Sequence, residues 1–254
     1  MKLDAATLLL QWSTGGLLFC WATTRRREVG VGYGWLLRST YLTIAAGGVF
    51  VGRVFVADGS ASLVRDLFGA GVVAACSAAL IVSILRRKTG VFPPVLDLAA
   101  PVMGLGGLIA ASVSVGGSEF LALARLVAGA AFLGGTTDAM LLGHWYLVQP
   151  KLGREPIKSL LKLVAWTWPV EVAVLCWPTG MFQIFTGAVD DGWNGVLGLI
   201  WAVSALSTIA LIGTTWLALK ERSYSAVMAA TGLLYLAILT AFGTDLIARA
   251  VLVP

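Results

Sequence analysis

Long runs of apolar residues, separated by short polar clusters, make up nearly the whole chain. A run of about 20 apolar residues crosses about 30 Å of hydrocarbon as an α-helix, and a helix satisfies its own backbone hydrogen bonds in lipid. The pattern therefore predicts an all-α bundle of about eight transmembrane helices, forming one domain over residues 1–254. The predicted spans are approximately 5–24, 34–57, 67–85, 91–116, 120–148, 160–182, 193–219 and 224–253.

Composition supports a protein embedded in a lipid bilayer. Hydrophobic residues make up 58% of the chain and charged residues only 12%, and the mean hydropathy is +0.88. Soluble domains carry about 25% charged residues. Because the predicted spans occupy almost all of the sequence, we expect no soluble catalytic domain within it.

The placement of basic residues predicts the topology. Lysines and arginines gather in the connections that follow the first, third, fifth and seventh predicted spans, and the opposite connections hold only Lys2 and Arg65. Basic residues accumulate on the cytoplasmic side, so both termini are expected on the non-cytoplasmic side of a bacterial-type plasma (inner) membrane, crossed many times. The clusters are Arg25–Arg27, Arg86–Lys88, Lys151–Lys162 and Lys220–Arg222. They are scattered over several connections, so the net charge of +5 does not indicate a nucleic-acid partner.

Glycine is frequent, with 30 residues, and much of it lies inside predicted spans, for example at Gly104 and Gly134–Gly135. Small residues allow membrane helices to approach each other closely. We therefore expect close helix contacts at these positions.

Two acids lie near the middle of consecutive predicted spans, Asp138 and Glu171. A charge there costs about 2.5 to 3.5 kcal/mol on insertion scales, so each acid needs a partner or a function. They could exchange protons, approach each other or share a cation, or each could pair with an arginine that holds the bundle together. The arginines available within spans are Arg38, Arg53 and Arg125.

Asp245 and Arg249 are spaced one helical turn apart in the last predicted span. An acid followed by a base at this spacing predicts an ion pair within one helix. A structural role is the simplest interpretation of this pair.

His144, the single histidine, lies near the predicted cytoplasmic boundary. Thr137 shares its helix face about two turns away, whereas Asp138 lies about 120° around the helix. His144, Trp145 and Thr137 could contact a quinone headgroup, His144 could relay protons, or it could be an interfacial histidine satisfied by a neighbour. One histidine excludes a bis-histidine haem within the chain, and the sequence lacks HExxH, GxSxG and phosphate-loop motifs, so no metal site is expected.

These features favour an integral membrane subunit of a respiratory-type electron-transfer complex. Such a subunit would anchor other protein subunits and handle quinone or protons, with Asp138, Glu171 and His144 as the proton-exchanging residues. One alternative is a proton- or ion-coupled small-molecule transporter or channel that uses Asp138 and Glu171. Another is a membrane assembly or scaffold protein without a ligand.

Overall fold

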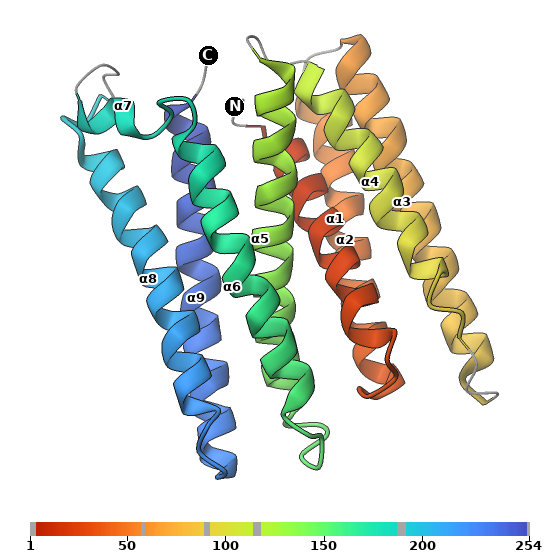
Figure 1. Ribbon diagram of the computed structural model, residues 1–254. Helices are drawn as coiled ribbons and strands as arrows, with labels where there is room; N and C mark the ends of the chain where they lie inside the picture. Colours follow the sequence, from red (N-terminus) through yellow and green to blue (C-terminus); the bar gives the residue numbers. More distant parts are fainter. Residues whose placement is uncertain (1–3, 57–58, 89–91, 114–117, 187–191, 253–254) are drawn as a thin grey trace. The chain divides into compact units, whose positions relative to one another are not determined.

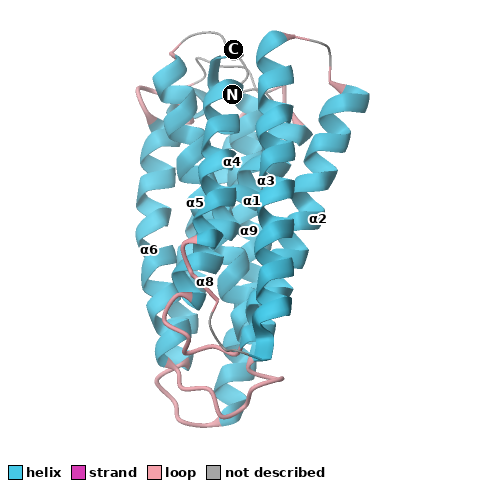
Figure 2. Ribbon diagram, turned by 90° about the vertical axis from the view of Figure 1, so that its right-hand side faces the viewer, coloured by secondary structure: helices cyan, strands magenta, loops and turns pink. Residues whose placement is uncertain are grey.

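The computed structural model describes residues 4–56, 59–88, 92–113, 118–186 and 192–252, and all regular structure in these ranges is helical (Figure 2). The predicted span ends at residues 57, 91, 116 and 253, and Lys2, lie outside the described residues. In chain order the helices are α1 (Ala5–Thr24), α2 (Val31–Phe55), α3 (Ser60–Leu85), the short 3₁₀ helix η1 (Arg86–Lys88), α4 (Leu96–Val113), α5 (Glu119–Trp145), α6 (Glu155–Cys176), α7 (Phe182–Phe185), α8 (Val196–Ala218) and α9 (Tyr224–Val251).

The all-helical prediction is confirmed, and each predicted span overlaps one long helix. Six helices are long and apolar enough to cross a membrane, namely α3 with η1, α4, α5, α6, α8 and α9. Helices α1 and α2 have similar length but carry more polar residues, such as Gln11, Thr14 and Arg38. The count of about eight spans and the side on which the termini lie stay predictions.

The described chain forms two compact units. The N-terminal unit contains Asp4–Asp138, and the C-terminal unit contains Ala139–Pro254, so α5 contributes residues to both. Within each unit the long helices alternate in direction along the chain (Figure 1). The prediction of a single domain over the whole chain is not tested by this division.

In the N-terminal unit, α1 packs against α2 and α4, and α3 packs against α2 and α4. The contact between α1 and α5 is made by glycines. A Cβ atom at Gly15 would lie only 1.7 Å from the Ala130 carbonyl oxygen, and one at Gly134 would lie 2.2 Å from the Gly15 carbonyl carbon. The absence of side chains therefore allows the two backbones to touch, as the glycine content predicts.

In the C-terminal unit, α8 packs along α9 and also contacts α6. The Thr208 hydroxyl bonds the Thr240 hydroxyl across α8 and α9 at 2.7 Å, and the Trp168 indole of α6 donates to the Ala205 carbonyl of α8 at 2.8 Å. Arg154, just before α6, donates to the carbonyls of Leu219 and Ser223 in the α8–α9 connection. Its guanidinium thus bonds the carbonyl of Leu219, the C-cap residue of α8, and that of Ser223, the N-cap residue of α9.

Buried hydroxyl groups are satisfied within their own helices. Many threonines donate to the carbonyl four residues earlier, a bond that hides the hydroxyl from hydrocarbon without needing another helix. This explains how spans rich in threonine remain compatible with a membrane. The examples include Thr14, Thr136, Thr137, Thr215 and Thr231.

Gly15→Ala is expected to destabilise the protein, because the new methyl group would overlap the Ala130 backbone, which cannot yield as a flexible side chain does. Overpacking of this kind costs about 1 to 3 kcal/mol or more. The matched control is Gly213→Ala, a helical position with nothing within 4 Å, where alanine should gain about 1 kcal/mol. Thermal unfolding in detergent measures both, and equal midpoints for the two variants would contradict the close contact.

Candidate functional site

A buried ion pair joins α2 to α4 in the N-terminal unit. Arg38 Nε donates to Asp97 Oδ1 at 2.8 Å and Nη2 donates to Oδ2 at 2.7 Å, with only 3% and 4% of the two side chains exposed. The remaining nitrogen, Nη1, lies 3.5 Å from the Ser83 hydroxyl, which also accepts the Trp35 indole N–H. The Phe92 ring covers the guanidinium at 4.5 Å. This two-pronged geometry neutralises both charges where water is excluded.

A second buried polar contact joins α2 to α5. The Tyr41 hydroxyl donates to Oδ1 of Asp138, and the Tyr33 hydroxyl donates to the Asp138 backbone carbonyl at 3.1 Å. The Asp138 side chain is completely buried, and its Oδ2 atom has no hydrogen-bond partner among the described residues. In the same part of the chain no lysine or arginine forms an ion pair with it.

These two contacts lie on one face of α2. Arg38 and Tyr41 are both buried, and Tyr41 lies about 4.5 Å further along the helix axis. The same face includes Gly34, one turn before Arg38. The polar residues of α2 therefore form a row that leads from its N-terminus to Asp138.

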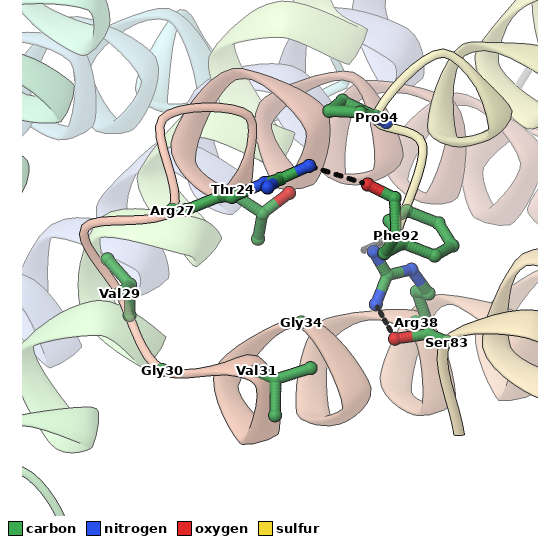
Figure 3. Close-up of a pocket in the computed structure, with 10 residues that line it drawn as sticks. All are labelled: Thr24, Arg27, Val29, Gly30, Val31, Gly34, Arg38, Ser83, Phe92 and Pro94. Atoms are coloured by element: carbon green, nitrogen blue, oxygen red, sulfur yellow. Dashed lines mark hydrogen bonds between the residues drawn. The ribbon is translucent and has the colours of Figure 1, made fainter. Parts of the chain in front are cut away.

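A cavity of about 250 Å³ opens at the start of this row (Figure 3). Arg27 and Arg38 approach it from two sides, and Arg27 Nη2 donates to the Phe92 carbonyl at 3.3 Å. The lining residues are Thr24, Arg27, Val29, Gly30, Val31, Gly34, Arg38, Ser83, Phe92 and Pro94. No group of three or more His, Cys, Asp or Glu side chains that could hold a metal occurs in the described residues.

Buried charges of the C-terminal unit gather near the end of α9. Arg249 Nε donates to Asp245 Oδ2 at 2.6 Å, one turn apart, and both side chains are buried. Nη1 and Nη2 of Arg249 have no hydrogen-bond partner in the part of the chain that is described. Ala248 belongs to the same apolar cluster as Leu175 of α6, and the completely buried Glu171 lies one turn before Leu175.

A third cluster corrects the sequence-based boundary of α3. The predicted span begins at residue 67 and assigns Arg65 to a connection, whereas α3 begins at Ser60 and buries both Arg65 and Asp66. Arg65 pairs with Asp66 at 2.8 Å and with Asp4, the N-cap of α1. The charges indicated a loop, but mutual pairing allows them to lie inside a packed helix. Arg53 lies 3.9 Å from Asp66 and is half-exposed.

The residues predicted to contact a quinone occupy different environments. Thr137 is buried, donates to the Leu133 carbonyl at 2.7 Å and accepts the Trp12 indole N–H at 2.8 Å. His144 is exposed, and its ring packs edge-on against the Tyr235 ring with 6.5 Å between the centroids. Trp145 donates to Gln149 Oε1 at 3.1 Å.

The two central acids belong to different units, Asp138 to the N-terminal and Glu171 to the C-terminal unit, so their proposed approach stays a prediction. Arg125, another candidate partner for these acids, is buried.

Sequence reasoning missed Asp97 and Tyr41. The signal for Asp97 was present, since Arg38 and Asp97 are opposite charges inside two predicted spans. Tyr41 gave no such signal.

Comparison with family models, curated proteins and solved structures finds no match for this chain. Its function must therefore be inferred from its own buried groups.

Arg38→Met is expected to cost about 3 to 5 kcal/mol, because it leaves the Asp97 carboxylate buried without its cation. The double variant Arg38→Met/Asp97→Leu should recover most of this loss, since no charge then remains unpaired. Unfolding of the purified variants in detergent forms a double-mutant cycle that measures the coupling. Losses that simply add would show that the two side chains do not stabilise each other.

Proposed function

We propose that the chain is an integral membrane subunit of a respiratory-type electron-transfer complex, in which Asp138 exchanges protons during quinone turnover. One observation carries the proposal, the burial of Asp138 against Tyr41 without an ion-pair partner in the described residues. Other buried aspartates of these ranges do have cations beside them. Asp97 pairs with Arg38, Asp66 with Arg65, and Asp245 with Arg249.

The difference matters because the two forms of a buried carboxyl group have very different free energies. An uncompensated carboxylate away from water costs several kcal/mol, whereas the protonated acid is neutral and needs only hydrogen bonds. An acid with a cation beside it keeps its charge and acts as a structural element. Asp138 lacks that compensation, and so is suited to take up a proton and release it again.

A quinone takes up protons together with electrons, and the exposed His144 supports a quinone as the reacting molecule. Its imidazole can donate a hydrogen bond to a quinone carbonyl, and the neighbouring Tyr235 ring offers an aromatic edge. Thr137, by contrast, already uses its hydroxyl on Leu133 and Trp12. A single histidine leaves no bis-histidine haem in this chain, so the electrons would come from another subunit that carries a redox centre.

The basic connections support a cytoplasmic orientation for one end of each unit. In the N-terminal unit, Arg27 contacts Phe92 and thereby joins the α1–α2 connection to the start of α4, beside η1. In the C-terminal unit, Arg154 contacts Ser223 and joins the basic α5–α6 and α8–α9 connections. We propose that both ends face the cytoplasm of a bacterial-type inner membrane, with the termini on the other side.

A proton- or ion-coupled carrier is the second candidate, and the complete burial of Glu171 within α6 favours it, because carriers hold ions on acidic groups inside the membrane. The two candidates differ in what Asp138→Asn and Glu171→Gln would abolish. Loss of gradient-driven solute uptake in proteoliposomes would support a carrier. Wild-type behaviour of both variants would leave a scaffold role.

Asp138→Asn should lower proton-coupled quinone turnover by about 10²-fold or more, the usual contribution of a positioned proton-transfer group. In infrared spectra it should also remove the band of a protonated carboxyl group. Tyr41→Phe, which deletes the hydrogen bond to Oδ1, should shift that band without removing it. The control is Thr136→Val, a buried position on the same helix whose hydroxyl donates to the Phe132 carbonyl within that helix. An unchanged carboxyl band in Asp138→Asn would refute proton storage there.

Gentle extraction from the native membrane should recover the chain together with at least one subunit that carries a redox centre, and with bound quinone. Protein and lipid mass spectrometry of the same sample measures both. His144→Ala should reduce the bound quinone while leaving the protein subunits in place. Recovery of the chain alone, without quinone, would argue strongly against the subunit function.

A further inference from the structure

The cavity at the beginning of α2 has an electrostatic character that proton exchange at Asp138 does not require. Its lining contains two arginines and no acidic residue (Figure 3). Arg38 is already neutralised by Asp97, whereas Arg27 is exposed. Among the described residues the Arg27 guanidinium donates to the Phe92 carbonyl at 3.3 Å and forms no ion pair. Arg27 therefore contributes an uncompensated positive charge and several N–H groups at the cavity mouth.

Backbone and hydroxyl groups add to this positive character. Gly30 is the N-cap residue of α2 and supplies no side-chain cap, and Val31 begins the helix beside the cavity. The N–H groups in the first turn of a helix lack the acceptor four residues earlier and carry the positive end of the helix dipole. In α2 the Tyr33 N–H already donates to the Gly30 carbonyl at 3.0 Å, so the N–H groups of Val31 and Gly32 are the ones that could face a ligand. The hydroxyls of Thr24 and Ser83 lie in the same lining and can donate hydrogen bonds.

Gly34 keeps the cavity open next to Arg38. A Cβ atom at this position would lie 2.8 Å from Arg38 Nη1, so any larger residue would crowd the guanidinium. The remaining walls, formed by Val29, Val31, Phe92 and Pro94, are apolar. The cavity thus combines a cationic mouth with an apolar side.

The position of the cavity along the helices is that of a membrane boundary. Ser83 lies in the last turn of α3, and Pro94 precedes α4, two helices that are apolar enough to cross a membrane. Further basic residues, Arg25, Arg26 and the η1 residues Arg86–Lys88, surround the same end. Phospholipid phosphates lie at this depth and are attracted to such clusters.

We propose that this cavity binds a phosphate group, with Arg27 and the first turn of α2 as its ligands and the apolar wall against the organic part of a phosphate ester. Arginine and helix N-termini are the groups that proteins use for phosphate. The volume of about 250 Å³ fits a phosphate with a small ester group. The phosphate comes either from an anionic phospholipid headgroup or from free inorganic phosphate, which share this chemistry.

The test uses the full-length protein in detergent with added phosphatidylglycerol, phosphatidylcholine or inorganic phosphate, and native mass spectrometry counts the bound molecules. Arg27→Gln should weaken binding by about tenfold, as expected for the loss of charge-assisted hydrogen bonds. The matched control is Arg26→Gln, since Arg26 is exposed in the same arginine cluster but does not line the cavity. Val31→Trp should also block binding by filling the cavity, because Val31 is 52% exposed and tolerates a larger residue.

The outcomes separate the two sources of phosphate. Retention of phosphatidylglycerol over phosphatidylcholine, without displacement by inorganic phosphate, identifies a lipid site. Binding of inorganic phosphate alone, lost in Arg27→Gln, identifies a free-phosphate site. Equal losses in Arg26→Gln and Arg27→Gln would show general attraction to a basic surface and overturn the proposal, as would absence of binding or unchanged binding in Val31→Trp. Thermal midpoints confirm that each variant is folded.

Discussion

Polar groups buried away from water must find their partners within the protein, and this constraint shapes the described structure at every level. Backbone groups meet it by forming helices. Threonine hydroxyls meet it by bonding the carbonyl one turn earlier, as Thr14 and Thr136 do. Most buried aspartates meet it through arginine, as Asp97 does with Arg38 and Asp245 with Arg249. The exception is Asp138, whose carboxyl group is bonded to a tyrosine and to no cation in the described ranges. Asp138 thus departs from the pattern of the other buried aspartates, and such a departure is where function is best sought.

Helix α2 connects the elements of the N-terminal unit, because successive turns of its buried face contact different neighbours. Gly34 leaves space beside the cavity, Arg38 crosses to α4 through Asp97, and Tyr41 crosses to α5 through Asp138. The helix is too polar to rank with the six most apolar helices, and these same residues are the reason. Its largest buried polar groups, Arg38 and Tyr41, face neighbouring helices, where each has a specific contact. Packing against those helices therefore compensates for the burial of these groups.

The helices could be predicted from sequence because a helix that crosses the hydrocarbon layer needs an apolar run of about 20 residues. The predicted span 5–24 coincides with α1. The depth of Glu171 was predicted less well: it was expected near the middle of a span over 160–182, but α6 runs from Glu155 to Cys176 and places Glu171 in its last third. The pairings could not be predicted, because residue spacing fixes depth but not which faces of distant helices meet. Tyr41 and Asp138 are 97 positions apart, and neither segment contains a sequence pattern that predicts their contact. The start of α3 was misplaced for a related reason, since Arg65 and Asp66 look like a loop until their pairing with Asp4 is known.

If Asp138 exchanges a proton as we propose, the contacts around it also determine which of its oxygens does so. Tyr33 donates to the Asp138 backbone carbonyl and Tyr41 donates to Oδ1, so two contacts from one helix hold the acid in a single orientation. Oδ2 would then be the oxygen that gains or loses the proton, because it has no hydrogen bond in the described residues. Oδ1 accepts hydrogen bonds both in the carboxylate and in an acid protonated on Oδ2, so the Tyr41 hydroxyl can donate to it in either protonation state. An arginine in its place would favour only the ionised acid. A tyrosine beside Asp138 is thus compatible with the proton exchange that we propose, whereas the arginines beside the other buried aspartates favour their ionised form.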